Sequence, residues 1–243
     1  MSRSGEVPVG VKVRTLPMQV AARLVERIAT GGPAPSELEI SQEFGVSRIV
    51  ARETLKILAS LDIVDIAQGR RVAVRPPEEW DYLNPLLAEW LPEEQVVTLL
   101  RELHQVRLLL EPELAAMAAA NMTDETLARL RQEMDRMTAL TGEPDHYLEA
   151  DHAFHMEICR AANNRILDRI MYSARWLGTA SRRVTNAPRG SLHRATDAHA
   201  RVLAALEARD PEAARAAMRD HLHGNIPILA EKEQRTKRAS AAP

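Results

Sequence analysis

Residues 33–61 read PAPSELEISQEFGVSRIVARETLKILASL, and they are the most informative segment in the first part of the chain. Its pattern predicts a short amphipathic helix that ends at Phe44, followed by a tight turn at Gly45. Ser47 can then cap a second helix that begins at Arg48. Two helices joined by such a turn are typical of a helix-turn-helix, whose second helix enters the major groove of DNA.

The second predicted helix carries a row of cations on one face. Arg48, Arg52 and Lys56 follow one another at intervals of four residues, so they share one side of the helix. The opposite side is apolar and can pack inward: Ala51, Leu55 and Leu58. A basic helix face is common on any protein surface, but the turn, the cap and the cation row together favour DNA binding. The predicted DNA-binding set is therefore Ser47 with this row, in which Arg48 and Arg52 read bases and Lys56 holds a phosphate.

A short β-hairpin is expected after these two helices. The β-prone runs 63–67 and 72–74 flank Gln68 and Gly69, and Arg70 and Arg71 at the tip can touch a phosphate or the minor groove. Upstream, Pro17 suits the first turn of a further helix with one apolar stripe. Residues 1–75 therefore predict a winged helix-turn-helix of three helices plus a β-hairpin.

These residues resemble the GntR family of bacterial transcription regulators. The likeness rests on the segments 35–41, 45–48 and 51–55 and on Gly69 of the wing. Two positions depart from the family pattern, since Ala51 replaces the usual valine and Gln-Gly-Arg-Arg replaces the commoner arginine–glycine at the wing tip. The resemblance implies a regulator that binds a DNA operator. Because one recognition helix reads only a few base pairs, we expect a homodimer on a near-palindromic site.

The composition agrees with a DNA-binding unit joined to a second domain. The chain has 243 residues, 45% of them hydrophobic, and a net charge of −2. Residues 1–75 hold 11 Lys and Arg against 8 Asp and Glu, a net charge of +3, and the remainder carries −5. Cys159 is the only cysteine, which excludes an intrachain disulfide. No apolar run suggests a membrane span or a signal peptide, so we expect a cytoplasmic protein without a membrane partner.

The second part of the chain is predicted to be helical, without strands after residue 75. Pro112 should kink or break the first helix near Glu111. The fold class is mainly α, a winged helix followed by an antiparallel bundle of six or seven helices. The expected divisions are 1–75 for DNA binding, 76–92 as linker and connecting helix, 93–232 as a metal- and effector-binding domain, and 233–243 as a disordered tail. The expected helices are 93–121, 123–140, 145–162, 165–184, 192–209 and 211–231.

Four polar residues fall on the inward faces of three of these helices. Asp151 and His155 lie four residues apart beside apolar neighbours, and His199 and His221 each lie on an apolar stripe of a later helix. A buried carboxylate needs a cation or hydrogen-bond partners. One divalent metal ion would satisfy all four side chains. Taken singly, each histidine is more simply an ordinary core or surface residue.

The helical part also resembles the effector-binding domain of the FadR-type branch of GntR regulators. The matching segments are 149–155, 161–164, His199 and 213–222. The resemblance implies that Asp151, His155, His199 and His221 are the four metal ligands, with zinc favoured and nickel or manganese as alternatives. It also favours Arg107, a cation on an apolar stripe, as a contact for the carboxylate of an effector. An internal salt bridge, for example to Glu111, explains Arg107 equally well.

Segments 79–90, 102–107 and 110–112 resemble a narrower group, the galactonate-type sugar-acid repressors. The leading hypothesis is a repressor released from its operator by a sugar acid or a related hydroxy acid. A metal-responsive regulator keeps the DNA function but makes the metal the signal. A metallohydrolase is the rival from another class, since such a centre can activate water. It leaves the DNA-binding unit unexplained, so we expect no enzymatic activity.

Overall fold

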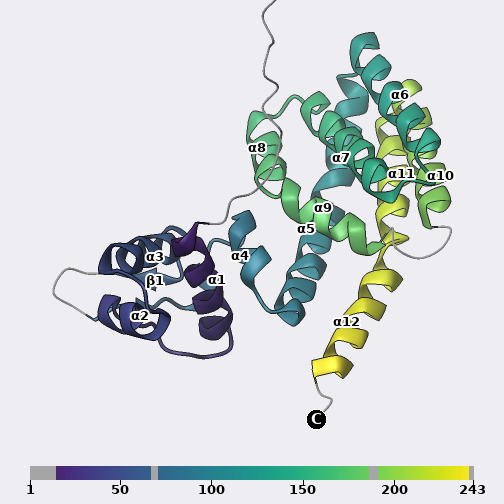
Figure 1. Ribbon diagram of the computed structural model, residues 1–243. Coiled ribbons are helices and arrows are strands. Elements are labelled where there is room, and N and C mark those ends of the chain that lie inside the picture. Colours follow the sequence, from purple (N-terminus) through teal and green to yellow (C-terminus); the bar gives the residue numbers. More distant parts are fainter. Residues whose placement is uncertain (1–14, 67–70, 186–190, 241–243) are drawn as a thin grey trace, which may run out of the picture. The chain divides into compact units, whose positions relative to one another are not determined.

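The structure is a computed structural model that describes residues 15–66, 71–185 and 191–240 (Figure 1). These residues form twelve α-helices, one short 3-10 helix and two short strands, which confirms the mainly α fold class. Contacts divide the chain into two compact units, residues 1–92 and 93–243. In the described residues no helix is both long and apolar enough to cross a membrane.

The first unit has the three helices and the hairpin that the sequence predicts. Helices α1 and α2 both pack against α3, and β1 and β2 pair antiparallel with Val64 opposite Val74. The core of the unit includes Leu24 of α1, Ile40 of α2 and Leu58 of α3, each fully buried. The elements are α1 (Leu16–Ala29), α2 (Glu37–Phe44), α3 (Arg48–Ser60), β1 (Val64–Asp65) and β2 (Ala73–Val74).

Local signals set the turn between α2 and α3. Helix α2 begins with a capping box, in which the Ser36 hydroxyl accepts the Glu39 amide hydrogen and the Glu39 carboxylate accepts that of Ser36. The helix ends at Phe44, and the next residue, Gly45, has a φ of 62°, in the left-handed region that glycine adopts without strain. Ser47 then caps α3 by accepting the Val50 amide hydrogen at 3.3 Å.

Residues 76–92, expected as a linker and connecting helix, pack against the first unit. They form a short 3-10 helix, η1 (Pro77–Glu79), and α4 (Pro85–Trp90), which packs against α1. Trp80 is buried, and its indole nitrogen donates a hydrogen bond to the carbonyl oxygen of Arg75 at 3.0 Å. The amide of Asp81 donates to the carbonyl oxygen of Leu61, which ties this segment to the end of α3.

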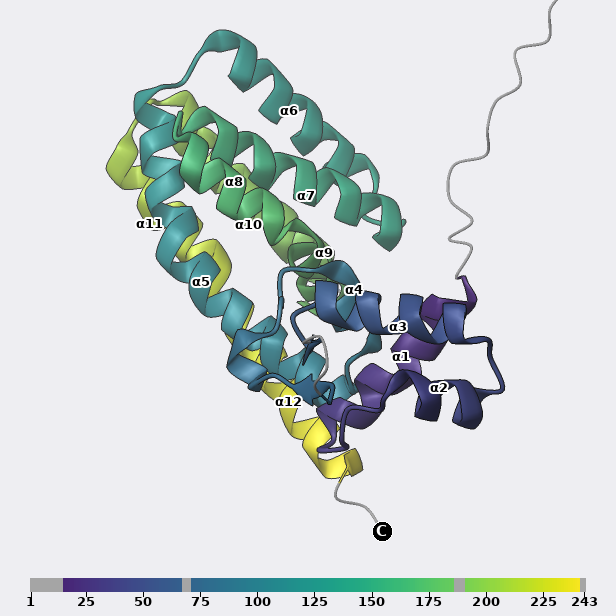
Figure 2. The same ribbon diagram turned by 90° about the vertical axis from the view of Figure 1, so that its left-hand side faces the viewer.

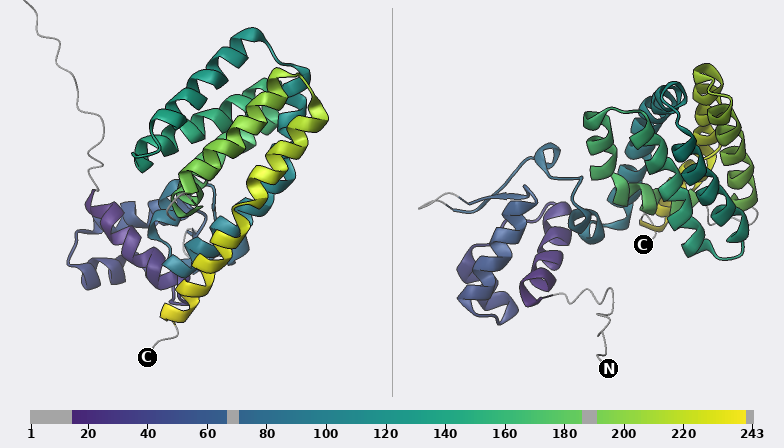
Figure 3. Two further views of the ribbon diagram at one scale, coloured as in Figure 1. Left: turned by 90° about the vertical axis from the view of Figure 1, so that its right-hand side faces the viewer. Right: turned by 90° about the horizontal axis from the view of Figure 1, so that it is seen from above.

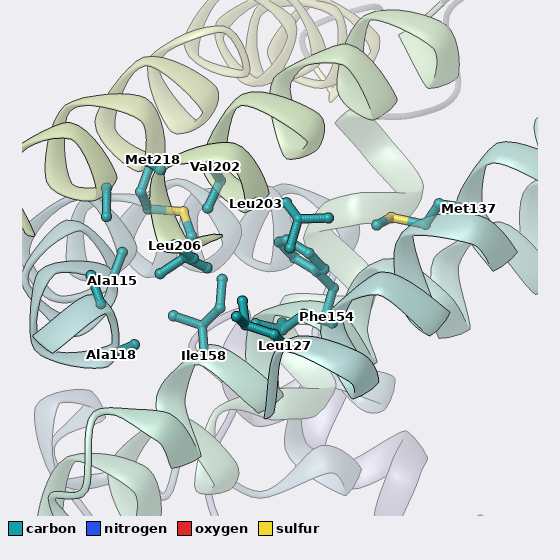
Figure 4. Close-up of a cluster of buried hydrophobic side chains, with 14 of the residues drawn as sticks. Ala115, Ala118, Leu127, Met137, Phe154, Ile158, Val202, Leu203, Leu206 and Met218 are labelled. Carbon is teal, nitrogen blue, oxygen red and sulfur yellow. The ribbon is translucent and has the colours of Figure 1, made fainter. Parts of the chain in front are cut away.

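The second unit is a bundle of helices built around α5. Figures 2 and 3 show α11 alongside α5, and α5 also contacts α7, α9, α10 and α12. Short turns join α6 to α7 and α10 to α11 as antiparallel pairs. The main core contains Phe154, Val202 and Met218 (Figure 4). The helices are α5 (Glu93–Ala120), α6 (Asp124–Ala139), α7 (Pro144–Ala161), α8 (Arg165–Ser173), α9 (Arg175–Thr185), α10 (Ser191–Glu207), α11 (Pro211–His223) and α12 (Ile226–Ser240).

The bundle differs from the sequence prediction in its helix boundaries. Helix α5 continues through the buried Pro112 without a break. The helix expected over 165–184 is divided at Ala174, and the last one is divided at Gly224 and Asn225, where glycine disfavours the helix. The described part of the expected tail, residues 233–240, is helical, because α12 packs against α5 and α9 and buries Thr236.

Candidate functional site

Helix α3 presents the predicted cation row to solvent. Arg48, Arg52 and Lys56 are exposed, as is the cap Ser47. The opposite side of the helix is buried through Ala51, Leu55 and Leu58, as its apolar pattern predicts. The helix is therefore held in the core by one face, and its cationic face is open to a partner such as the phosphate and base edges of DNA.

Two cations of this face are paired with carboxylates of the protein. The Arg52 guanidinium donates from Nε and Nη2 to the two carboxylate oxygens of Glu37 on α2, at 3.1 and 3.3 Å. The hydrogen bond to Glu37 is the main cause that raises the Arg52 pKa. Lys56 donates to Glu53 at 2.8 Å. Both pairs are exposed, so their contribution is small and a stronger anion can displace the carboxylates.

The predicted wing residues are only partly described. Arg71 is exposed just before β2, whereas Arg70 lies outside the described residues. At the base of the hairpin the Arg75 guanidinium bridges Asp62 and Glu79, at 2.9 and 2.7 Å. These pairs tie the returning strand to the end of α3 and to η1.

In the second unit the four predicted metal ligands lie together in the interior. Asp151 and His155 come from α7, His199 from α10 and His221 from α11, and all four are buried. One ligand atom from each of the three histidines lies within 4.8 Å of the others. The Asp151 Oδ1 atom lies 3.1 Å from His199 Nε2.

Contacts of the Nδ1 atoms orient the imidazole rings of His155 and His199. His199 Nδ1 lies 2.7 Å from the carbonyl oxygen of Ala195, so this nitrogen carries the hydrogen and donates it. His155 Nδ1 lies 2.7 Å from Oε2 of the Glu111 carboxylate, which likewise accepts. With Nδ1 as the donor, the neutral form of each ring has an unprotonated Nε2. These two Nε2 atoms lie 3.1 Å apart. In metal-ligating histidines, the ring nitrogen that does not bind the metal typically donates to a carboxylate or a backbone carbonyl oxygen in this way.

This donor set fits a divalent metal. The lone pairs of His155 Nε2, His199 Nε2 and Asp151 Oδ1 converge, and they repel one another unless a cation lies among them. A proton would bridge a single pair of atoms, whereas a metal ion would satisfy all three and His221 as well. Two ligand atoms held at about 2.1 Å from one tetrahedral or octahedral metal lie roughly 3.0–3.4 Å apart. The observed separations of 3.1 Å agree with that spacing.

His221 is the fourth candidate ligand. Burial, together with the neighbouring His199 and His155, holds the pKa of His221 well below its ordinary value. Its ring centroid lies 4.2 Å from that of His199. Because a histidine must be neutral to bind a metal, no proton has to be removed from His221 first.

Arg107 is fully buried and forms an ion pair with Glu111 one turn later on α5. Its Nε donates to Glu111 Oε1 at 2.6 Å, and its Nη2 lies 3.4 Å from Oε2. Burial opposes ionisation of Glu111, but Arg107 and His155 outweigh it and hold the pKa of this carboxyl well below its usual range. Arg107 thus makes the internal salt bridge that was the alternative to an effector contact. The sequence suggested Glu111 as a partner of Arg107 but not of His155. The contact between Glu111 and His155 joins residues that are 44 apart in the chain.

A small pocket adjoins this cluster. Arg107, Glu111 and His155 line one side, and Met171, Ala174 and Arg175 line another. Its free space is close to that of one water molecule, so a larger ligand could enter only if the wall moved. That wall includes the junction at Ala174 between α8 and α9.

Comparison with known proteins places both units in described families. The profile of the bacterial regulatory proteins of the gntR family matches residues 16–74, and that of the FCD domain matches residues 102–224. The Uxu operon regulator of Haemophilus influenzae is 30% identical over 201 residues, which cover 79% of this chain and 71% of that protein. The Galactonate operon transcriptional repressor of Escherichia coli is 28% identical over 141 residues, 58% of this chain and 62% of that protein.

Solved structures agree on the fold. The structure of Lar from Listeria monocytogenes superposes with a TM-score of 0.56 and covers 90% of this chain and 99% of that one, at 18% identity. At that identity the likeness speaks for the fold alone.

Proposed function

The chain belongs to the gntR family of bacterial regulatory proteins that carry an FCD domain, and we propose that it represses transcription until a small carboxylate binds its helical unit. The family makes the protein a transcription regulator and not an enzyme. The exposed row Arg48, Arg52 and Lys56 would hold the operator. The wing would add Arg70 and Arg71, and Ser47 would lie beside the bases at the start of α3.

The observation that carries the regulatory part is the buried cluster of His155, His199 and His221 beside the pocket. With Asp151 these residues would hold one divalent metal ion, for which zinc suits the nitrogen-rich donor set and nickel or manganese are alternatives. When bound, such an ion supplies positive charge and open coordination positions for a carboxylate. Glu111 and Ala195 would keep His155 and His199 turned toward it.

Arg107 would bind the carboxylate of the effector while it keeps its ion pair with Glu111. Its Nε and Nη2 face Glu111. The guanidinium has further N–H groups that could donate hydrogen bonds to a carboxylate in the pocket. The relatives named for galactonate and Uxu operons favour a sugar acid as that carboxylate. Because the pocket is small, binding would require the wall formed by α8 and α9 to move. This movement couples the effector to the shape of the bundle.

A metal-responsive regulator is the second candidate, since the same cluster could sense the metal itself. In that case operator affinity would change with metal alone. In the favoured account a metal-loaded protein binds its operator and releases it only when the acid is added.

Gel-shift titration on the DNA upstream of the protein's own gene tests the proposal, with a panel of sugar and hydroxy acids. We expect the metal-loaded homodimer to bind a near-palindromic site and one acid of the panel to weaken it roughly fivefold or more. If no acid changes the operator affinity, but zinc, nickel or manganese does, the metal-responsive alternative is favoured. Absence of sequence-specific binding would contradict the DNA-binding function itself.

A further inference from the structure

Ile49 lies in the first turn of α3 and leaves 75% of its surface in solvent. Among the described residues, no large apolar side chain is more exposed. Single apolar side chains on a surface are ordinary in themselves. The exposure of Ile49 is informative because this residue lies at the N-terminal end of α3, the end that is expected to approach the bases.

Ile49 belongs to the face of α3 that also carries the cations. The exposed positions of the helix follow one continuous side, which includes Arg48, Ile49 and Arg52. Four residues after Ile49, Glu53 pairs with Lys56 at 2.8 Å. Ile49 is thus one aliphatic group in a charged surface, and it adds nothing to the core that holds α3 in place.

The chemistry of the major groove leaves one partner for such a group. Base edges there present hydrogen-bond donors, acceptors and a single apolar group, the 5-methyl of thymine. An isoleucine side chain has neither donor nor acceptor, so it can recognise only that methyl. Arg48 and Arg52, on the same exposed side of α3, carry guanidinium groups suited to guanine.

We propose that Ile49 contacts the 5-methyl group of one thymine in each operator half-site and selects a T·A pair at that position. This inference rests on the proposed DNA-binding function, and it adds a specificity-determining residue beside the cation row. The contact removes an exposed aliphatic group and a methyl group from water, which is favourable without any hydrogen bond.

Replacement of thymine by deoxyuridine tests the contact, because it removes the methyl group and leaves every hydrogen-bonding atom of the base. The operator is first selected from a randomised DNA pool by the wild-type protein. Each thymine of one half-site is then changed singly to deoxyuridine, and the dissociation constant is measured for the full-length wild type, Ile49→Ala and Leu109→Ala. Leu109 on α5 is the matched control, since it is 74% exposed and lies in the other unit.

We expect one thymine at which deoxyuridine weakens binding of the wild type and of Leu109→Ala by about fourfold, the effect of one buried methyl group. Ile49→Ala should bind the two DNAs equally. The inference is overturned if the half-site contains no thymine, if no deoxyuridine change affects the wild type, or if the penalty persists in Ile49→Ala. If no sequence is enriched at all, the DNA-binding function fails and this inference with it.

Discussion

Glu111 of α5 contacts His155 of α7, with 2.7 Å between Oε2 of the carboxylate and Nδ1 of the imidazole. The same carboxylate accepts a hydrogen bond from Arg107 at 2.6 Å. One buried acid therefore neutralises a buried cation and orients a candidate metal ligand. Helices α5 and α7 both line the pocket, and α7 also carries two of the candidate ligands. A change at the pocket can therefore reach the histidine cluster through Glu111.

Glu111→Gln removes this negative charge and nearly preserves the shape of the side chain. Because it leaves the buried Arg107 without its counter-ion, we expect the free energy of unfolding of metal-free protein to fall by about 3 kcal/mol or more. Loss of the orienting contact should also weaken metal binding roughly tenfold or more. Urea unfolding and metal titration measure the two effects. The matched control is Glu113→Gln, whose exposed pair with Arg215 should matter little. Equal stability of the two variants would contradict this account.

Arg52→Ala and Lys56→Ala should affect DNA binding in different ways. Loss of an arginine–guanine contact should cost about 1–3 kcal/mol of discrimination between bases, so Arg52→Ala binds operator and unrelated DNA more equally. Lys56→Ala should weaken binding to all sequences alike and reduce its salt dependence. Competition gel shifts at several salt concentrations separate the two. Unchanged operator preference in both Arg52→Ala and Arg48→Ala would rule out these residues as base contacts.

His104 should make the second unit less stable in mild acid. Its burial, aided by repulsion from Arg107 and His223 and opposed by Glu111 and a hydrogen bond at Leu222, lowers the pKa of His104 from 6.5 to about 4. Between these pH values the unfolded chain binds a proton that the folded chain does not, so stability is lost as the pH falls through this window. His104→Gln should flatten the pH dependence of unfolding there. The exposed His146 is the control, and parallel curves for wild type and His104→Gln would refute the prediction.

The intact protein should be a homodimer at micromolar concentration. Two recognition helices double the number of bases read and match a near-palindromic operator. Light scattering gives the molecular mass of the free protein and of its DNA complex. A monomer that still binds the operator with full affinity would contradict the expectation.

Local sequence signals predicted the parts of the molecule that depend on neighbouring residues. The end of α2 at Phe44, with the turn at Gly45, and the cap of α3 at Ser47 follow from backbone preferences and from local hydrogen bonds, and the structure confirms both. The spacing of Asp151 and His155 likewise predicted a shared face on one helix, and both side chains are buried.

Features that depend on tertiary packing were not predictable in the same way. The contact between Glu111 and His155 arises only when α5 and α7 pack together. Helix α12 extends over the expected tail because α5 and α9 cover it, although its own sequence is largely polar. The division at Ala174 interrupts a continuous helical pattern, and it determines which residues line the pocket. Periodicity within one segment carries no information on any of these contacts.

The most direct test compares operator release by the effective acid in the wild type, His199→Ala and the control His193→Ala. His199 lies in the buried cluster, and His193 is an exposed residue of the same helix. We expect the wild type and His193→Ala to contain metal and to release the operator when the acid is added. His199→Ala should contain less metal, melt at a lower temperature and still bind the operator, but fail to release it. If the wild type, purified without chelator and offered zinc, nickel and manganese, binds none of them, or if His199→Ala responds to the acid like the wild type, the metal site does not control DNA binding.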